Sequence, residues 1–508
     1  MNKNISIKSI VIPVILIGLT FFSCMEQEKS KPDLKTVVII IDGLRKDYLS
    51  ETNSPNLYKL SKMGVEGLHS HSIFPTLTRV NSTSYATGSY PVRHGILGNS
   101  IYLPAVDAVK GINTGDFKAL MKADSVEKGR LLLVKTFGEW VEDQGETDFT
   151  IFSSGTTGQS FLLNQRIKGR GIINPDLILP SNLEKEVIAK VGEIPAKERP
   201  NLPRHKWITD AFIEFDLKSD KSSISTIWFS DPDGTAHATG IGSPMTLASI
   251  KGVDDQVGRI LQYIQENGME NQVNIIISSD HGFSTHIGEG SLEDFLIEKG
   301  LKTGEDSDDV IVVGNAVYVK DKAKIRTIAE AFQKEDWVGA VFSKEEETAN
   351  IPGTLSQHLI YWQHAERAAD LYVDVNWNDE ENEFGYKGAS FNRGTAGHGS
   401  SSPFEMQTPF IAVGPSFKKQ FANPLPTALI DIMPTVLHIH GIKIDQEIDG
   451  RVLDEILVEN TAFYSEQPQK TLKVEHKIDG IFYKIDLFQT DWNGKTYFDY
   501  SKTGRVVE

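Results

Sequence analysis

The stretch Val37-Val38-Ile39-Ile40-Ile41-Asp42-Gly43 decides the fold, because a run of β-branched apolar residues ends abruptly in a carboxylate and a glycine. A second stretch, Ile275-Ile276-Ile277-Ser278-Ser279-Asp280-His281-Gly282, repeats this pattern. Continuous apolar runs without alternation are typical of strands that are buried on both faces, as in a parallel sheet. We therefore predict an α/β fold in which helices sandwich a mostly parallel sheet.

The segments around these runs carry the helices and strands that such a sheet requires. Residues 243–265 show apolar positions at helical spacing, and residues 225–229 are predicted as another buried strand. Further strands are predicted at 370–375 and 409–413, and further helices at 54–63, 81–88 and 426–440. The tail from residue 471 to 507 alternates apolar and polar residues and contains an Asn-Gly turn, which predicts a small C-terminal β element.

The predicted organisation of the chain is one catalytic domain with flanking segments. We place a signal peptide at 1–24, a polar tether at 25–35, the catalytic domain at 36–460 and a C-terminal β extension at 461–508. Irregular stretches at about 103–135, 164–203 and 302–393 are predicted as insertions or a lid beside the core.

The overall charge excludes one class of partner. The 508 residues carry a formal net charge of -17. Proteins that follow a nucleic-acid backbone need a basic surface, so no nucleic-acid binding is expected. Chemistry on small phosphate esters stays possible, because bound metal ions can neutralise the phosphate charge locally.

The single cysteine, Cys24, lies directly after a signal-type segment. Lys3 and Lys8 precede the apolar residues 10–22, and Ser23 comes just before the cysteine. This arrangement resembles the bacterial lipobox, although the lipobox favours leucine where this chain has Phe21. The alternative is an uncleaved N-terminal anchor. Either way we expect an exported, membrane-anchored protein, and the lipobox implies a lipoprotein, periplasmic or at the cell surface, with its lipid on Cys24.

Carboxylates and imidazoles follow the predicted strands in short clusters. The six candidate metal ligands are Asp42, Asp233, His237, Asp280, His281 and His398. In open parallel sheets the carboxyl ends of the strands meet at one crevice, so we expect these groups to converge. Carboxylate and imidazole ligands without thiolate suit zinc and also allow manganese or iron. Two divalent ions bound together can clamp the attacking and leaving oxygens of a phosphoryl transfer.

A hydroxyl that could act as nucleophile lies between the first two ligand clusters. Thr78 is the second threonine of Phe74-Pro75-Thr76-Leu77-Thr78 and precedes a predicted helix, whose N-terminal N–H groups favour a phosphate oxygen. Asn99 could donate its side-chain amide to another phosphate oxygen. Taken singly, Asp42 could be a helix cap, Asp233 a turn residue and His398 a loop histidine. Their joint order favours the metal site, and His286 is predicted to lie in a solvated loop.

These motifs, in this order, resemble those of the alkaline phosphatase superfamily, and most closely the nucleotide pyrophosphatase/phosphodiesterase family. The resemblance covers Asp42-Gly43-Leu44-Arg45, Phe74-Pro75-Thr76-Leu77-Thr78, His94-Gly95-Ile96 through Asn99, Pro232-Asp233 with His237, Asp280-His281-Gly282, Gly397-His398-Gly399 and Asp431-Ile432-Met433-Pro434-Thr435. It implies a metal-dependent phosphoric ester hydrolase that acts on a small phosphate ester or a nucleotide.

The resemblance also implies how the site is divided between two divalent ions, expected to be zinc. One ion would be held by Asp233, His237 and His398, and the other by Asp42, Asp280, His281 and the Thr78 oxygen. Thr78 would form a phospho-threonine intermediate that water then hydrolyses. Where the family usually has Phe-Pro-Asn after the nucleophile, this chain has Arg79-Val80-Asn81, so Arg79 is a candidate substrate-binding residue.

Three other activities compete with the phosphodiesterase interpretation. A phosphomonoesterase would need extra cationic groups, for which Arg79, Lys168 and Arg170 are candidates. A phosphonate hydrolase of the same superfamily would use a similar threonine and similar metals. A sulfatase is disfavoured, because its Cys/Ser-x-Pro-x-Arg motif is missing around the nucleophile. A non-catalytic surface binding protein that kept a metal site is the alternative outside enzymes.

Overall fold

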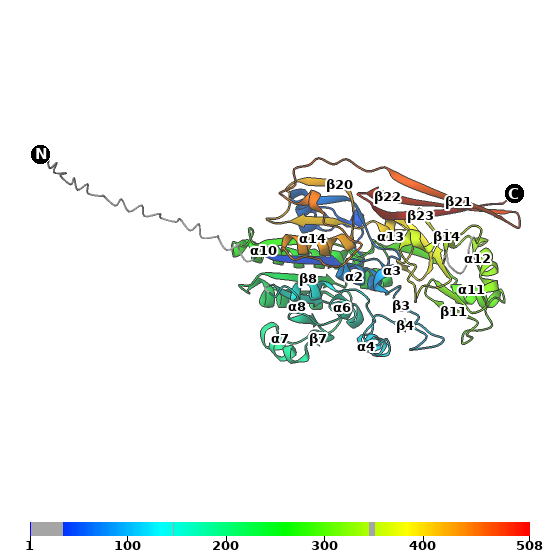
Figure 1. Cartoon of the computed structure of the whole chain (residues 1–508), viewed down its shortest axis with the longest axis horizontal. Helices are drawn as coiled ribbons and strands as arrows, with labels where there is room; N and C mark the ends of the chain where they lie inside the picture. Colours follow the sequence, from blue (N-terminus) through cyan, green and yellow to red (C-terminus); the bar gives the residue numbers. More distant parts are fainter. Residues whose placement is uncertain (2–33, 146, 345–350, 508) are drawn as a thin grey trace. The chain divides into compact units, whose positions relative to one another are not determined.

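The computed structural model describes residues 1, 34–145, 147–344 and 351–507 (Figure 1). The predicted signal peptide, Cys24 and the predicted tether up to residue 33 lie outside the described residues. In the part of the chain that the structure describes, no helix is both long enough and apolar enough to cross a membrane.

A nine-stranded sheet forms the centre of the unit that spans Asp33–Glu508. Its strands lie in the order β20 (Phe421–Ala428), β2 (Val65–His71), β19 (Phe410–Val413), β9 (Val273–Ser278), β1 (Lys35–Ile41), β8 (Ser223–Phe229), β5 (Asp148–Ser153), β6 (Gly171–Asn174) and β7 (Leu177–Leu179). β19 and β7 run antiparallel to their neighbours, and the other pairs are parallel. The predicted mostly parallel sheet is confirmed.

Both faces of this sheet are buried under helices, because alternate residues of β1 belong to two different cores. Val38 and Ile40 pack with α2 (Thr78–Thr87), α5 (Phe137–Glu142) and α14 (Ile432–Ile439). Ile39 and Ile41 pack with α1 (Pro55–Met63), α8 (Leu202–Phe212) and α10 (Pro244–Glu266). The side chains of Val38, Ile39, Ile40 and Ile41 are fully buried. This two-sided burial explains why the strand reads as a continuous apolar run in the sequence.

Smaller sheets flank the central one. A five-stranded sheet has the order β11 (Val310–Val313), β12 (Ala316–Val319), β15 (Leu371–Val375), β13 (Val338–Ser343) and β14 (Leu355–Ser356), and α11 (Leu292–Glu298) and α12 (Ile325–Gln333) pack on it. A four-stranded sheet joins β16 (Trp377–Glu381), β17 (Lys387–Arg393), β10 (Ser284–Gly288) and β18 (Ala396–Gly397). Residues 302–393 therefore supply most of both sheets.

The remaining elements are short. The α-helices are α3 (Pro91–His94), α4 (Phe117–Val126), α6 (Thr157–Leu163), α7 (Glu184–Val191), α9 (Asp233–Thr239) and α13 (Pro403–Met406). The 3-10 and π turns are η1 (Lys46–Tyr48), η2 (Ser181–Leu183), η3 (Ile213–Leu217), η4 (Lys322–Lys324), η5 (Gln357–Ile360), η6 (Leu429–Asp431) and η7 (Asp454–Ile456). A two-stranded sheet pairs β3 (Ser100–Ile101) with β4 (Ile112–Asn113). Residues 164–203 include β6 and β7, which form one edge of the central sheet.

The predicted C-terminal β element is confirmed as an antiparallel sheet of β21 (Gln469–Ile478), β22 (Ile481–Trp492) and β23 (Lys495–Val507), drawn in orange to red in Figure 1. Tyr483, Ile485 and Leu487 of β22 are fully buried in a core shared with Phe74 and Phe342. The Tyr483 hydroxyl donates to the Gly339 carbonyl at 2.6 Å. The sheet is therefore packed onto the rest of the unit that spans Asp33–Glu508.

Two local predictions were wrong. The helix predicted at 426–440 begins only at Ile432, because residues up to Ala428 belong to β20. β20 is an edge strand, where the missing N–H groups of Pro424 and Pro426 are tolerated. His286 lies in β10 and not in a solvated loop; its Nδ1 donates to the Arg393 carbonyl at 2.7 Å, and burial lowers its pKa to about 4.

Candidate metal centre and nucleophile

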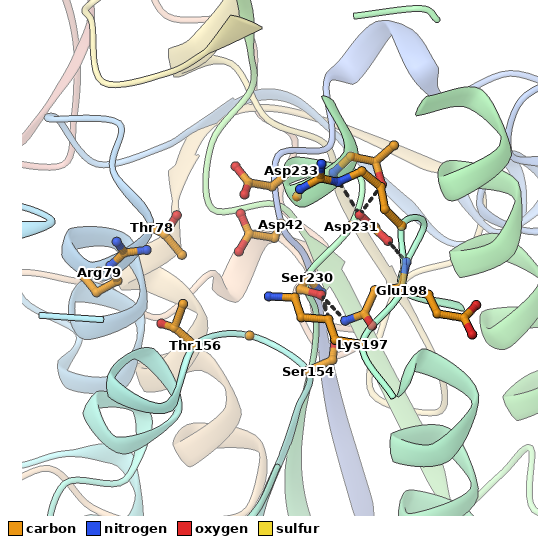
Figure 2. A pocket seen from close by; sticks show the side chains of 15 residues that line it. Asp42, Thr78, Arg79, Ser154, Thr156, Lys197, Glu198, Ser230, Asp231 and Asp233 are labelled. Atoms are coloured by element: carbon orange, nitrogen blue, oxygen red, sulfur yellow. Dashed lines mark hydrogen bonds between the residues drawn. The ribbon is translucent and has the colours of Figure 1, made fainter. Parts of the chain in front are cut away.

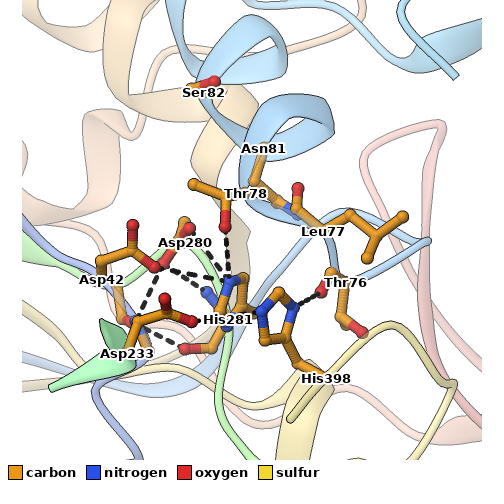
Figure 3. Close-up of polar contacts among 12 residues, drawn as sticks. Asp42, Thr76, Leu77, Thr78, Asn81, Ser82, Asp233, Asp280, His281 and His398 are labelled. Atoms are coloured by element: carbon orange, nitrogen blue, oxygen red, sulfur yellow. Dashed lines mark hydrogen bonds and ion pairs between the residues drawn. The ribbon is translucent and has the colours of Figure 1, made fainter. Parts of the chain in front are cut away.

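The ends of three neighbouring parallel strands carry most of the candidate ligands. Asp42 directly follows β1, Asp280 and His281 follow β9, and the turn after β8 leads into α9, which begins at Asp233. Asp233 and His237 are four residues apart on α9 and so share one face of the helix. His398 follows β18 of the four-stranded sheet. The predicted convergence of these groups is found (Figure 3).

Gly43 lies where a side chain would be both strained and crowded against the site. Its φ is +73°, in the left-handed region, and a Cβ there would lie 3.0 Å from the Phe283 ring and 3.1 Å from the Asp233 Cβ. A larger residue would push Asp233 away from Asp42. The glycine of the sequence motif is therefore a packing requirement of the site.

Asp42, Asp280 and His281 form one buried ligand group. The His281 Nε2 lies 3.2 Å from the Asp280 Oδ2 and 3.6 Å from the Asp42 Oδ1. The Thr78 hydroxyl lies 3.2 Å from the same His281 Nε2. Thr78 is the first residue of α2, and its side chain is buried. The predicted nucleophile therefore faces this ligand group (Figure 3).

Asp233, His237 and His398 form the second ligand group. The Asp233 Oδ1 lies 3.2 Å from the Nε2 atoms of both histidines, and those two nitrogens are 3.2 Å apart. The rings of His398 and His281 stack with their centroids 3.5 Å apart. The two groups are therefore adjacent, as two ions acting on one phosphate would require.

The three histidines share one orientation. Their Nδ1 atoms face backbone carbonyls, of Gly282 at 2.9 Å from His281, of Ala396 at 2.9 Å from His237 and of Thr76 at 2.6 Å from His398. A carbonyl can only accept, so each Nδ1 carries a hydrogen, and each Nε2 faces the carboxylates. This arrangement is typical of metal-ligating histidines.

The three aspartates of the ligand groups lie close to one another, and each has a buried oxygen without a hydrogen-bond donor. Asp42 Oδ1, Asp233 Oδ1 and Asp280 Oδ2 are buried and accept no hydrogen bond. Burial, followed by the charges of Asp280 and Asp233, raises the pKa of Asp42. Burial and Asp233 raise the pKa of Asp280 to about 8. Burial of anionic oxygens without donors is costly, and bound cations remove that cost, so the donor set fits two divalent ions.

Asp233 differs from the other two carboxylates. Burial acts to raise its pKa, but the neighbouring His237 and His398 outweigh burial and hold the pKa well below the usual range. Trp228 provides a further contact that the sequence did not indicate: its Nε1 donates to the Asp42 Oδ2 at 3.0 Å. This bond sets the orientation of the Asp42 carboxylate: Oδ2 faces Trp228, and Oδ1 faces His281.

Asn99 and Arg79 lie next to the nucleophile. The Asn99 Oδ1 accepts the backbone N–H of Arg79 at 3.1 Å, which leaves the N–H groups of the Asn99 side chain for another acceptor. Arg79 and Thr78 line a cavity of about 420 Å³ (Figure 2). Burial lowers the pKa of Arg79, and Asp42, Asp233 and Asp280 partly offset the shift.

The other cationic candidates for a phosphomonoesterase are not at this cavity. Arg170 pairs with Asp148 at 3.0 Å and donates to the Phe215 carbonyl. Lys168 is not among the residues that line the cavity. The basic residues that do line it, besides Arg79, are Lys197 and Arg199, which the sequence analysis did not single out.

Glu405, which sequence reasoning also did not single out, contacts two loops of the candidate site. Its Oε2 accepts from the Thr76 hydroxyl at 3.0 Å and from the N–H groups of Gly399 and Ser400, each at 2.7 Å. It thereby ties the loop before Thr78 to the loop after His398. No local pattern around Glu405 marks this role.

The fold and the site together define the class of protein. The structure resembles that of murine ectonucleotide pyrophosphatase/phosphodiesterase 5, with a TM-score of 0.60 at 18% identity, over 83% of this chain and 100% of the other. It also resembles a mutant of the alkaline phosphatase PafA, with a TM-score of 0.62 at 17% identity, over 84% of this chain and 100% of the other. These likenesses show an alkaline-phosphatase-like fold.

Sequence comparison gives the family. The model of the type I phosphodiesterase/nucleotide pyrophosphatase family matches residues 36–379, so the chain belongs to that family. It is 23% identical over 413 residues to the bis(5'-adenosyl)-triphosphatase ENPP4 of Pongo abelii, covering 80% of this chain and 78% of the relative. It is 22% identical over 450 residues to human ectonucleotide pyrophosphatase/phosphodiesterase family member 5. The matched region covers 87% of this chain and 80% of the relative.

Family membership settles the general activity. The chain is a nucleotide pyrophosphatase/phosphodiesterase-like hydrolase of the alkaline phosphatase superfamily, and so a phosphoric ester hydrolase. The superfamily resemblance drawn from the ordered motifs is confirmed. The family is metal-dependent, and the two ligand groups are present in this structure.

Proposed function

We propose that the chain is a two-metal phosphodiesterase or pyrophosphatase that uses Thr78 as its nucleophile. The observation that carries this proposal is the position of the Thr78 hydroxyl, 3.2 Å from the His281 Nε2 and beside carboxylate oxygens that lack any donor. The N–H groups at the start of α2, where Thr78 lies, favour a phosphate oxygen.

Two divalent ions would be held by the two ligand groups. Asp233, His237 and His398 would hold one, and Asp42, Asp280, His281 and the Thr78 oxygen the other. Zinc is the first choice, since the ligands are carboxylates and imidazoles. Bound there, the ions would supply positive charge beside the attacking hydroxyl and beside the leaving oxygen.

The chain's own residues perform the remaining tasks. The Thr78 hydroxyl loses its proton to solvent and its oxygen forms a bond to phosphorus, while the bond from phosphorus to the leaving oxygen breaks and that oxygen takes up a proton, which gives a phospho-threonine. Water then attacks the same phosphorus and releases Thr78. The Asn99 side-chain amide donates to a non-bridging oxygen, since its own oxygen is engaged by the Arg79 N–H at 3.1 Å.

The substrate class we propose is small phosphate esters including nucleotides, which the shape and charge of the cavity narrow further, and the protein acts outside the cytoplasm. The nucleotide part is supported by the relatives: one is called a bis(5'-adenosyl)-triphosphatase, and an inactive variant of murine family member 5 is described in complex with AMP. Export and anchoring through a lipid on Cys24 are supported by the signal-type segment before it.

A phosphomonoesterase is the second candidate, and one observation favours it. Arg79 lines the cavity beside Thr78, and its Nε has no hydrogen-bond partner. A guanidinium in this place could bind the extra charge of a monoester. Arg79 is thus the residue whose substitution distinguishes the two activities.

Metal removal tests the two-metal proposal. Dialysis against a chelator should abolish hydrolysis of bis-para-nitrophenyl phosphate, and added zinc should restore it. Elemental analysis should find two metal ions per chain. Full activity in a preparation that contains no metal would contradict the proposal.

A further inference from the structure

The cavity beside Thr78 has a strongly polar lining. It is formed by the start of α2, the loop 154–156 after β5, the loop after β8 and the segment 197–201 between α7 and α8. Among the described residues that line it, none has an aromatic side chain. Aromatic rings are what proteins commonly stack on a nucleobase, so this cavity lacks that means of recognition.

The aromatic side chains near the site lie in a different cavity. A second cavity of about 180 Å³ is lined by Asn99, His398, Trp362 and Tyr372, among others. Trp362 and Tyr372 are buried and pack against each other with ring centroids 5.0 Å apart, and the Trp362 Nε1 donates to the Leu97 carbonyl at 2.9 Å. These two rings are committed to the protein core. A third ring that lines this cavity, Tyr318, is half-buried; it packs against Tyr102 with ring centroids 4.8 Å apart, and its hydroxyl donates to the Arg367 carbonyl at 2.9 Å.

Cationic side chains lie on opposite walls of the cavity beside Thr78. Figure 2 shows Arg79 on one wall, extending from α2, and Lys197 on the other. Arg199 lines the cavity as well. Lys197 and Arg199 are exposed, and no described carboxylate forms an ion pair with either. Glu198 lies between them in sequence, but Figure 2 shows its carboxylate turned away from Thr78 and Arg79.

The segment that carries Lys197 and Arg199 is fixed on both sides of these residues. Before them, Trp207 donates to the Gly192 carbonyl at 3.1 Å and Arg204 to the Pro195 carbonyl at 3.1 Å. After them, the Asn201 N–H donates to Asp231 at 2.7 Å, two residues before Asp233. The backbone that carries the two cations is therefore anchored close to the metal ligands, while the side chains of Lys197 and Arg199 are exposed at the cavity.

This positive charge exceeds what the reacting phosphate needs. Two divalent ions would balance the three aspartates of the ligand groups and the single charge of a phosphodiester. Arg79, Lys197 and Arg199 add three positive charges to the cavity, and Asp231 and Glu198, which also line it, offset two of them, so about one positive charge remains. Such a surplus, at the mouth of a polar cavity, suits a second anionic group on the same substrate molecule.

We propose that this cavity binds a phosphate or carboxylate on a polar arm of the substrate, which sets the substrate class as doubly anionic esters without an aromatic base. This inference rests on the proposed Thr78 phosphodiesterase activity and specifies its substrate. Lys197 and Arg199 are the residues that determine the specificity, and the hydroxyls of Ser154, Thr156 and Ser230 line the path of the arm.

A series of para-nitrophenyl phosphodiesters that differ only in the second ester arm tests the proposal. The arms are carboxyethyl, phosphoethyl, hydroxyethyl, choline and thymidine. For the wild-type protein, kcat/KM should be about tenfold higher for the two anionic arms than for hydroxyethyl, and lowest for choline. The anionic preference should shrink as the salt concentration rises. The carboxyethyl and phosphoethyl esters show which oxyanion is preferred.

Variants assign the preference to the two cations. Lys197→Gln and Arg199→Gln should each lower kcat/KM about three- to tenfold for the anionic arms and by clearly less for hydroxyethyl, so that the anionic preference shrinks. The double variant K197E/R199E should favour the choline ester. Lys185→Gln, an exposed lysine on α7 that does not line the cavity, is the matched control and should change nothing.

The outcomes separate this inference from the proposed function. Equal rates for anionic and neutral arms, equal losses on all esters in the variants, or a thymidine ester that is tenfold better than the others would overturn the doubly anionic class alone. If the wild-type protein with zinc hydrolyses none of the esters, the phosphodiesterase proposal itself is contradicted.

Discussion

At the scale of single residues, Thr78 carries the chemistry that we propose. Its hydroxyl is buried at the start of α2, and Thr78→Ala removes the nucleophile but keeps the Asp and His side chains of both ligand groups. We expect turnover of a phosphodiester to fall by several powers of ten, while zinc content and thermal stability stay near the wild-type values. Steady-state kinetics measures the turnover, elemental analysis the zinc content and thermal denaturation the stability.

The conservative variant Thr78→Ser is the control for this prediction. It keeps a hydroxyl in the same place and should retain measurable turnover. If Thr78→Ala kept more than about a tenth of the wild-type rate, the covalent role of Thr78 would be wrong.

Arg79 is predicted to decide between monoesters and diesters. Its guanidinium lies among Asp42, Asp233 and Asp280, and it lines the cavity next to Thr78. A phosphate monoester carries about one more negative charge than a diester near neutral pH. Arg79→Ala should therefore lower kcat/KM for a monoester more than for a diester, by about 1–3 kcal/mol of transition-state binding. Equal losses on both substrates would refute this role.

At the scale of structural elements, Glu405 of α13 holds two functional loops together. It accepts from Thr76 and from the N–H groups of Gly399 and Ser400, and the Thr76 carbonyl in turn orients His398. Glu405→Ala should lower zinc affinity about 10–100-fold, as the loss of other outer contacts of a metal site does. Competition with a chelating dye measures this affinity.

Glu405→Gln serves as the matched control, since its amide oxygen can still accept from the backbone. It should bind zinc more tightly than the alanine variant does. Wild-type zinc affinity in Glu405→Ala would show that the two loops hold their positions without this carboxylate.

The elements also show how far the sequence could predict the site. Asp42 and Asp280 directly follow apolar runs, so their strands and the rule for parallel sheets were enough to bring them together. Trp228 could not be found in this way, because it reaches Asp42 from 186 positions away in the sequence. Lys197 belongs to a stretch without periodicity, and its place at the cavity depends on contacts made by Trp207, Arg204 and Asn201.

For the fold as well, elements with a strong sequence pattern were predicted and elements without one were not. The apolar runs predicted the central sheet and the helices on its two faces, because burial on both sides leaves a strong pattern. The five-stranded sheet lies within residues 302–393, a stretch that was predicted as an insertion; its strands are only two to six residues long, too short to leave a clear pattern in the sequence. The helix predicted from residue 426 failed because the prolines of an edge strand are equally compatible with a helix start.

At the scale of the whole molecule, Cys24 is predicted to place the protein at a membrane. A lipid on Cys24 would tether the catalytic unit, which begins near Asp33. Cys24→Ser should convert a membrane-associated protein into a soluble or incorrectly processed one. Detergent partitioning and mass spectrometry of the N-terminal peptide check this. Unchanged partitioning and an unmodified Cys24 in the wild-type protein would exclude the lipoprotein.

The stereochemical course at phosphorus tests the central claim most directly. Attack by Thr78 followed by attack of water inverts the phosphorus twice, so the overall result is retention, whereas direct attack by water gives one inversion. A phosphorothioate diester of a single configuration is hydrolysed in isotopically labelled water, and the configuration of the product is determined. We predict retention of configuration. Inversion would contradict a covalent intermediate on Thr78 and with it the mechanism proposed for this site.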